Sequence, residues 1–176
     1  MDRFNFGPAQ LGEPMVFGAQ RPGYNDKSVQ QGAVAEWITF MQRRGIQRVC
    51  CLLPAEQLGY YEGDLLAAYR QEFGVEHVCH VGIPDYHLCT LADLNNKILP
   101  FLSESDDNQM PVVVHCSGGS GRTGHVLAAW LVRRRGLSVE AAIHAVCLAG
   151  RNPNEAVDRG NAIKATLTAL LLGTER

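Results

Sequence analysis

A cysteine and an arginine stand at the two ends of a glycine-rich stretch and are the residues best suited to chemistry in this chain. The stretch reads His115-Cys116-Ser117-Gly118-Gly119-Ser120-Gly121-Arg122-Thr123-Gly124. The β-branched run 111–114 before it predicts a buried strand, and the pattern after it predicts a helix over 123–135. In a turn between a strand and a helix, several backbone N–H groups can point into one concavity, and the helix N-terminus adds about half a positive charge. The stretch therefore predicts a site for an anion such as phosphate.

Cys116 and Arg122 suit complementary roles at such a site. A helix end and a nearby cation both favour the thiolate form of a cysteine, so we expect Cys116 to be a nucleophile. The planar guanidinium of Arg122 can bind two phosphate oxygens at once, which a lysine cannot do. We also expect the Thr123 hydroxyl to hydrogen-bond the Cys116 sulfur. The magnesium-dependent loop GxxxxGK[ST] is excluded, because Arg122 takes the place of its lysine and the first glycine is missing. No metal or other cofactor is expected.

The ten residues 115–124 resemble the signature His-Cys-x5-Arg-[Ser/Thr]-Gly of the cysteine-dependent protein phosphatases. The resemblance implies that Cys116 attacks phosphorus to form a phosphocysteine, which water then hydrolyses. It implies that His115 supports the loop and helps to keep the cysteine ionised without transferring protons. It also implies an aspartate on a separate loop as general acid, and equatorial phosphate oxygens held by Arg122 and the loop. The loop residues that would bind phosphate are Ser117, Gly118, Gly119, Ser120 and Gly121.

The general acid needs a carboxyl group on a loop near the sulfur, and Asp85 is the best candidate. It lies in the stretch 81–87, whose proline-aspartate pair predicts a loop, and it precedes Cys116 by 31 positions. In the family the acid loop likewise comes some thirty residues before the cysteine. The competitor Asp93 belongs to a Thr-x-x-Asp capping pattern, which gives it a structural role. The polar stretch 103–109 is predicted to be a solvated loop.

Strands and helices alternate along the predicted chain. Strands are predicted at 15–17, 47–53, 75–81 and 111–114. Helices are predicted from 28–31 to 43–44, and at 63–73, 91–102, 123–135, 138–147 and 154–172. This order predicts a single α/β domain over 1–176, with a catalytic core at about 15–172 and a mainly parallel central sheet flanked by helices on both faces. The resemblance implies the cysteine phosphatase fold. Because Cys116 and Asp85 both follow strands, both should lie at the carboxyl edge of the sheet.

Local capping patterns mark several helix ends. A Ser-x-x-Gln box at 28–31 is predicted to open the first helix, and Ser138 is predicted to cap a later one. The arginines at 133–135 precede Gly136, which is a helix stop signal, since cations favour the C-terminal end of a helix. We therefore interpret these arginines as end-of-helix charges and not as a nucleic-acid patch.

Composition excludes several classes of protein. The 176 residues are 46% hydrophobic and 19% charged, with a net charge of −2, which gives no general attraction for nucleic acid or anionic lipid. No apolar stretch reaches the roughly 18 residues that a membrane span requires, and no signal peptide is visible, so a cytoplasmic location is expected. The six cysteines show no zinc-ligand spacing with the histidines, and burial accounts for most of them. The sequence leaves open which of the other cysteines reaches Cys116 as a redox partner.

Within the family, the missing features indicate a subclass. At 176 residues the chain has little room for the segment that deepens the pocket of the larger tyrosine-specific enzymes. It therefore looks most like a small atypical dual-specificity phosphatase, acting on phosphotyrosine and also on phosphoserine or phosphothreonine in a protein or peptide partner. The loop has no lysine, which argues against a polyphosphoinositide substrate. The alternatives are a catalytically weak phosphate-binding module, an RNA 5′-triphosphatase and a small-molecule phosphatase, and the oligomeric state stays open.

One departure from the family concerns the second step of the reaction. Many relatives place a glutamine after the cysteine helix to position the attacking water, whereas this chain has no glutamine after Gln109. Asn154 or Glu155 could orient the water, or Asp85 could act alone as the base. Arg21, near the N-terminus, resembles a recurring feature of small relatives and is expected on the substrate side.

Overall fold

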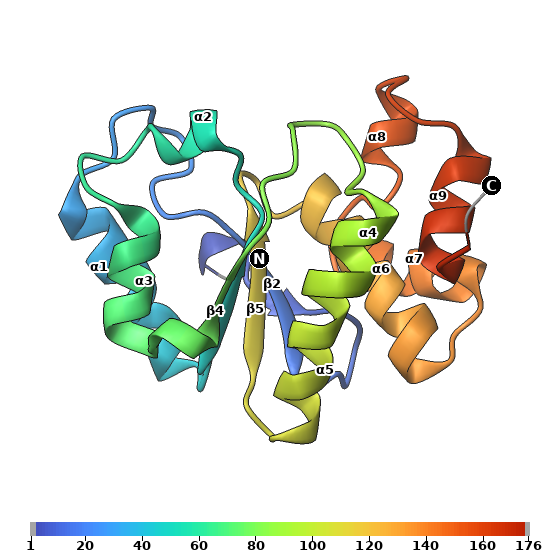
Figure 1. Cartoon of the computed structure of the whole chain (residues 1–176), viewed down its shortest axis with the longest axis horizontal. Helices are drawn as coiled ribbons and strands as arrows, with labels where there is room; N and C mark the ends of the chain where they lie inside the picture. The colour runs from blue at the N-terminus through green and yellow to red at the C-terminus, as the bar shows by residue number, and fades with distance from the viewer. Residues whose placement is uncertain (1–2, 175–176) are drawn as a thin grey trace.

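A five-stranded sheet separates two groups of helices in the computed structural model, which describes residues 3–174 (Figure 1). From one edge to the other, the strands are β1 (Gly7–Pro8), β2 (Val16–Gln20), β5 (Val112–Cys116), β3 (Arg48–Cys51) and β4 (Val78–His80). β1 is antiparallel to β2, and all other neighbours are parallel. The predicted α/β fold with a mainly parallel sheet is therefore confirmed, whereas β1 was not predicted.

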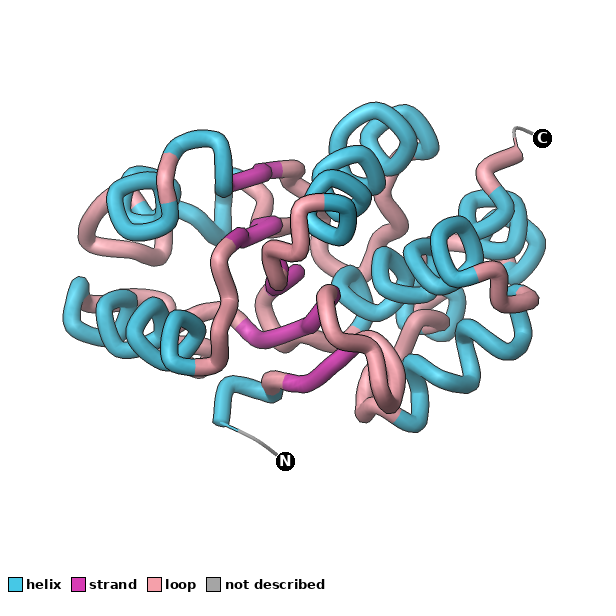
Figure 2. The backbone as a smooth tube through the Cα atoms, turned by 90° about the horizontal axis from the view of Figure 1, so that it is seen from below, coloured by secondary structure: helices cyan, strands magenta, loops and turns pink. Residues whose placement is uncertain are grey.

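Helices cover both faces of the sheet, as Figure 2 shows. The amphipathic helices α1 (Gln31–Arg43) and α3 (Leu65–Phe73) lie on one face, and the one-turn helix α2 (Ala55–Leu58) follows β3. The helices on the other side are α4 (Leu91–Asp93), a π-helical turn (Leu94–Ile98), α5 (Leu99–Asp107), α6 (Gly121–Arg135), α7 (Val139–Leu148), α8 (Glu155–Asp158) and α9 (Lys164–Leu172). Short 3-10 turns occur at Arg3–Asn5 and Val75–His77.

Burial patterns explain why these elements form. All five residues of β5 are buried, as expected for a central strand of a parallel sheet that is covered on both faces. α6 is buried along eleven consecutive residues from Gly121, because it packs against the sheet and against α7 and α9. α1 buries only Val34, Trp37, Ile38 and Met41, the spacing of one helix face. β5 and α6 thus form a rigid frame around the loop that joins them.

Several predicted boundaries are wrong, and one is that of the strand 75–81, whose first three residues form the 3-10 turn Val75–His77 before β4. The N-cap residue of α1 is Gln30, whose side chain makes no capping hydrogen bond, so Ser28 does not open this helix. The predicted single helix 154–172 is divided into α8 and α9, because Gly160 adopts a positive φ of 76° between them and ends the first helix. Ser138 does cap α7, by accepting a hydrogen bond from the Ala141 N–H.

The stretch 103–109 is not a solvated loop, because α5 continues to Asp107. Asp106 is largely buried and pairs with Arg134 and Arg135 at the end of α6. The hydrogen bonds from these arginines lower the pKa of Asp106, and the bond from Arg135 has the largest effect. Arg134 and Arg135 at the end of α6 therefore form ion pairs with α5 of the same chain.

The carboxyl ends of the parallel strands gather the segments that matter for chemistry. Cys116 is the last residue of β5, and the segment that carries Asp85 follows β4. The first residue after β2, Arg21, donates its backbone N–H to the Ser117 carbonyl (3.0 Å), so the segment after β2 lies against the same loop. Among residues 3–174, no helix is both long and apolar enough to cross a membrane.

Candidate active site

Cys116 lines a small cavity of about 130 Å³ at the carboxyl edge of the sheet. Its side chain is buried, with 2% of the residue exposed. The cavity is lined by Tyr24, Asp85, Tyr86, Cys116, Ser117, Gly118, Ser120, Gly121, Arg122 and Glu155. The structure thus brings the predicted nucleophile, arginine and acid to one place, together with most of the predicted phosphate loop.

The backbone of this loop is oriented by hydrogen bonds to four successive carbonyl groups. The Cys116 carbonyl accepts from His115 Nδ1 (3.3 Å), and the Ser117 carbonyl accepts from the Arg21 N–H (3.0 Å). The next two carbonyls, those of Gly118 and Gly119, are held by side chains. Their donors are Asn5 Nδ2 (3.1 Å) and Arg151 Nη1 (2.8 Å).

None of these four donor residues lines the cavity, so the loop carbonyls point away from it. Each peptide bond is trans, because the described residues contain no cis peptide, and a trans peptide directs its C=O and N–H to opposite sides. The N–H groups of residues 117–120 are therefore turned toward the cavity. The side chain of the N-cap residue Ser120 makes no capping hydrogen bond to α6, which leaves the helix end available to an anion as well.

Arg122 is buried beside Cys116 and is held by three groups. Its Nη2 pairs with Asp85 Oδ1 (2.9 Å), and its Nη1 donates to Gln57 Oε1 (2.9 Å) and to the Ile83 carbonyl (3.1 Å). Gln57 also donates from Nε2 to Asp85 Oδ2 (3.3 Å), so it bridges the cation and the acid. The guanidinium is thereby fixed in orientation before any substrate binds, which favours bidentate recognition of phosphate.

His115 is buried and neutral. Burial, together with the charges of Arg122 and Arg21, lowers its pKa to about 3, although its hydrogen bond to the Cys116 carbonyl opposes this shift. Because Nδ1 donates to that carbonyl, Nε2 is the acceptor for the Tyr69 hydroxyl (3.1 Å). His115 thus binds the backbone of the loop and is not suited to proton transfer at neutral pH.

Three other predicted residues have defined positions. The Thr123 hydroxyl is buried and has no hydrogen-bond partner among residues 3–174, so the predicted bond to the Cys116 sulfur is not formed. Thr90 caps α4 by accepting from the Asp93 N–H, and the Asp93 carboxylate accepts from the Thr90 hydroxyl and pairs with Lys97, which confirms the structural role of Asp93. Arg21 lies behind the cavity and not on the substrate side, since its guanidinium binds the Tyr24 carbonyl and the Ser117 hydroxyl.

Sequence reasoning missed Gln57 and Arg151. Arg151 is buried, and its guanidinium donates to the carbonyls of Asn5, Gly7, Gly18 and Gly119. Burial lowers its pKa to about 10. No sequence signal could have revealed this role, because the partners are backbone carbonyls, which every residue carries. Gln57 follows a strand, like Asp85, and this position was the only available clue.

Gly119 is required by both its conformation and its surroundings. Its φ is +70°, and a Cβ there would lie 2.5 Å from the backbone carbon and oxygen of Ala19. We expect Gly119→Ala to lower the free energy of unfolding by more than about 2 kcal/mol, because a clash adds to the cost of the left-handed backbone. Urea unfolding measures this change.

Gly136→Ala is the matched control for this prediction. Gly136 has a nearly identical φ of +71°, but a Cβ there meets no atom within 4 Å. Only the backbone cost of roughly 1 kcal/mol should therefore appear. Equal losses in the two variants would show that the loop has room for a side chain at Gly119.

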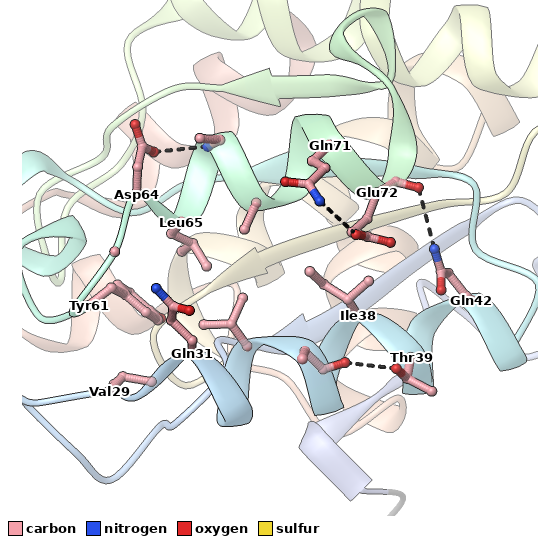
Figure 3. Close-up of a pocket in the computed structure, with 15 residues that line it drawn as sticks. Val29, Gln31, Ile38, Thr39, Gln42, Tyr61, Asp64, Leu65, Gln71 and Glu72 are labelled. Atoms are coloured by element: carbon pink, nitrogen blue, oxygen red, sulfur yellow. Dashed lines mark hydrogen bonds between the residues drawn. The ribbon is translucent and has the colours of Figure 1, made fainter.

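A larger cavity of about 520 Å³ lies between α1 and α3 (Figure 3), and Cys116 is not one of its lining residues. Gln42 of α1 donates to the Glu72 carbonyl of α3 (3.4 Å) at one end of it. Among the described residues that line this cavity, none is a cysteine, histidine, lysine or arginine. It therefore lacks the groups that would bind or attack a phosphate.

Comparison with solved structures supports the same fold. A mutant form of Tk-PTP is 25% identical, with a TM-score of 0.64, and the match covers 90% of this chain and 87% of that one. Kinase associated phosphatase, with its catalytic cysteine replaced by serine, is 22% identical, with a TM-score of 0.69 and 88% of each chain covered. At this lower identity, the match to kinase associated phosphatase shows a similar fold alone.

Sequence relatives give a second comparison. An uncharacterised protein of Methanocaldococcus jannaschii is 45% identical over 51 residues, which are 29% of this chain and 34% of that protein. A family model described as "Polymorphic toxin system, DSP-PTPase phosphatase" (Tc-R-P) matches residues 25–136. This match spans the loop and more than half of the chain, whereas the curated relatives are matched over only about a third of their own length, so the protein belongs to this family of dual-specificity-type cysteine phosphatases.

Proposed function

We propose that this protein removes phosphate from phosphorylated tyrosine, and also from phosphorylated serine or threonine, through a phosphocysteine intermediate on Cys116. The observation that carries the proposal is the orientation of the loop between β5 and α6. Four of its backbone carbonyls, those of residues 116–119, are hydrogen-bonded to groups outside the cavity, so the N–H groups of residues 117–120 face the cavity. Such fixed donors stabilise the charge that spreads over the equatorial oxygens during phosphoryl transfer.

In the first step, the Cys116 thiolate attacks phosphorus and Asp85 protonates the leaving oxygen. The incoming phosphate takes over the Arg122 Nη2 that Asp85 binds in this structure, which frees the carboxyl group to turn toward the leaving oxygen. Thr123 brings its buried, unpartnered hydroxyl to the first turn of α6, and we assign to it a hydrogen bond to the sulfur when the thiolate is released. Positioning and electrostatics supply most of the rate.

The walls of the cavity support an aryl phosphate as substrate. Tyr24 and Tyr86 both line it and are 44% and 40% exposed. The Tyr24 hydroxyl stands over Gly118, since a Cβ built there would lie 3.3 Å from it. The guanidinium of Arg159 lies 4.6 Å from the centre of the Tyr86 ring. Two aromatic side chains can flank the ring of a phosphotyrosine. Because the cavity is small, the phosphate of a shorter phosphoserine or phosphothreonine side chain can also reach the Cys116 sulfur.

The test is phosphate release from p-nitrophenyl phosphate, followed by a comparison of phosphotyrosine, phosphoserine and phosphothreonine peptides of matched sequence. We expect release from the aryl phosphate and from the phosphotyrosine peptide, unchanged by EDTA. Binding of phosphopeptides without release from any phosphomonoester would overturn the proposal in favour of a phosphate-binding module. Release from free small esters alone would overturn the assignment of a protein substrate.

Gln57 should contribute to this reaction by positioning Arg122 and Asp85. Gln57→Ala removes a hydrogen bond to each of them, and a bond to a charged group contributes about 1.5–3 kcal/mol. We expect kcat/KM for the aryl phosphate to fall about tenfold or more, and thermal unfolding to show that the variant remains folded at the assay temperature. The control is Gln71→Ala, an exposed glutamine in α3 whose side chain, within residues 3–174, hydrogen-bonds to the neighbouring Glu72 and lies away from Arg122 and Asp85. Equal activity in the two variants would contradict the role of Gln57.

A further inference from the structure

Glu155, the first residue of α8, faces the same cavity as Cys116 and Asp85. Asn154, the other candidate for orienting water, is not among the lining residues, and its backbone N–H donates to Asn152 Oδ1 (3.1 Å). The site therefore holds two carboxyl groups, and Glu155 lies beyond the segment that matches the family model.

The Glu155 carboxyl group packs directly against the start of α6. A Cβ added to Gly121 would lie 1.8 Å from Glu155 Oε2, so only a glycine leaves this space open. The carboxyl group is thus placed at the end of the phosphate loop, at the rim of the cavity that contains the Cys116 sulfur.

The two carboxyl groups differ in their partners. Both oxygens of Asp85 are engaged, one by Arg122 and the other by Gln57. The carboxyl oxygens of Glu155 make no hydrogen bond or ion pair with the part of the chain that the structure describes. Glu155 is consequently free to bind a water molecule in the cavity, whereas Asp85 is held to the cation.

The surroundings also make Glu155 a stronger base than an ordinary glutamate. Burial raises its pKa, and the negative charge of Asp85 raises it further, with a smaller contribution from Asp158. Arg122 and Arg159 act in the opposite direction. A base is most effective when its pKa lies closer to the working pH, so this shift favours proton removal from water.

We propose that Glu155 is the general base that activates water for hydrolysis of the phosphocysteine. The water oxygen forms a bond to phosphorus while one of its protons passes to the Glu155 carboxylate. The S–P bond breaks, its electron pair returns to Cys116 as the thiolate, and inorganic phosphate leaves. Asp85 serves the first step as proton donor. This inference rests on the proposed function and divides the two steps between two carboxyl groups.

The test separates the two steps by rapid mixing with p-nitrophenyl phosphate. Glu155→Gln should release one equivalent of nitrophenol per enzyme at the wild-type rate, because attack by Cys116 is intact. Its steady-state rate should then fall about 10²-fold or more, as expected when a general base is lost. Intact mass spectrometry after acid quenching should show one phosphate adduct on the variant. Glu140→Gln, an exposed glutamate in the first turn of α7, is the matched control and should behave like the wild type.

A wild-type steady-state rate in Glu155→Gln would overturn the role of Glu155 while leaving the phosphatase assignment intact. A slower first phase without an adduct would place Glu155 in the first step and would also overturn it. Absence of an adduct in every variant, with no nitrophenol from the wild type, would overturn the covalent mechanism and this inference with it. Thermal unfolding shows whether the variant is folded.

The pH profile gives a readout that a purely structural role would not change. In the wild type, the hydrolysis step should slow as the pH falls through the raised pKa of Glu155, because protonation removes the base. This acidic limb should be absent from the residual rate of Glu155→Gln. An unchanged limb would assign it to another group and contradict the proposal.

Discussion

Cys116→Ser should lower kcat for an aryl phosphate by at least about 10⁴-fold, the scale expected when a covalent nucleophile is removed. A serine hydroxyl is not ionised at neutral pH and is a far weaker nucleophile than a thiolate. The side chain is buried at the end of β5, and the hydrogen bonds that orient the loop go to backbone carbonyls, so they survive the substitution. Phosphate affinity, measured by calorimetry with inorganic phosphate, should therefore be retained in part.

The matched control is Cys147→Ser, because Cys147 is exposed near the end of α7. It should leave kcat, phosphate affinity and thermal stability unchanged. If Cys116→Ser kept the activity of the wild type, the assignment of the nucleophile would be wrong. If it lost phosphate affinity entirely, the loop amides would not be the main binding groups.

Arg122→Lys should lower kcat/KM for the same substrate by about 10²–10³-fold, although the positive charge is kept. Lysine cannot present the planar fork that binds two phosphate oxygens. It also cannot reproduce the contacts that Arg122 makes with Gln57 and Asp85 at the same time. Steady-state kinetics measure the loss, and the fall should appear mainly in kcat, because the spread of charge is largest in the transition state.

Arg43→Lys is the control for this substitution, since Arg43 is an exposed residue in the last turn of α1. It should have wild-type kinetics. Arg122→Ala provides a further comparison, because it removes both the positive charge and the planar guanidinium group. Activity in Arg122→Lys close to that of the wild type would mean that a point charge is sufficient, and it would contradict bidentate binding.

The sequence alone predicted the α/β fold and the centre of the site. Both depend on short-range patterns: the β-branched run and the glycines around Cys116 fix a strand, a turn and a helix within about 25 residues. Placement of Asp85 followed from topology, because the ends of parallel strands meet at one edge of a sheet. The Thr90 and Ser138 caps were correct for the same local reason.

Only the tertiary structure decided which groups hold these residues in place. The Gly119 carbonyl binds Arg151, and Arg122 binds Gln57, contacts between segments 32 and 65 residues apart. Any carbonyl can accept a hydrogen bond and any glutamine can bridge two charges, so residue types do not reveal these partners. The position of Glu155 depends in turn on the break between α8 and α9 and on the space beside Gly121. Local patterns therefore predicted the residues that we propose to react, and long-range packing determined how those residues are oriented and that Glu155 lies beside them.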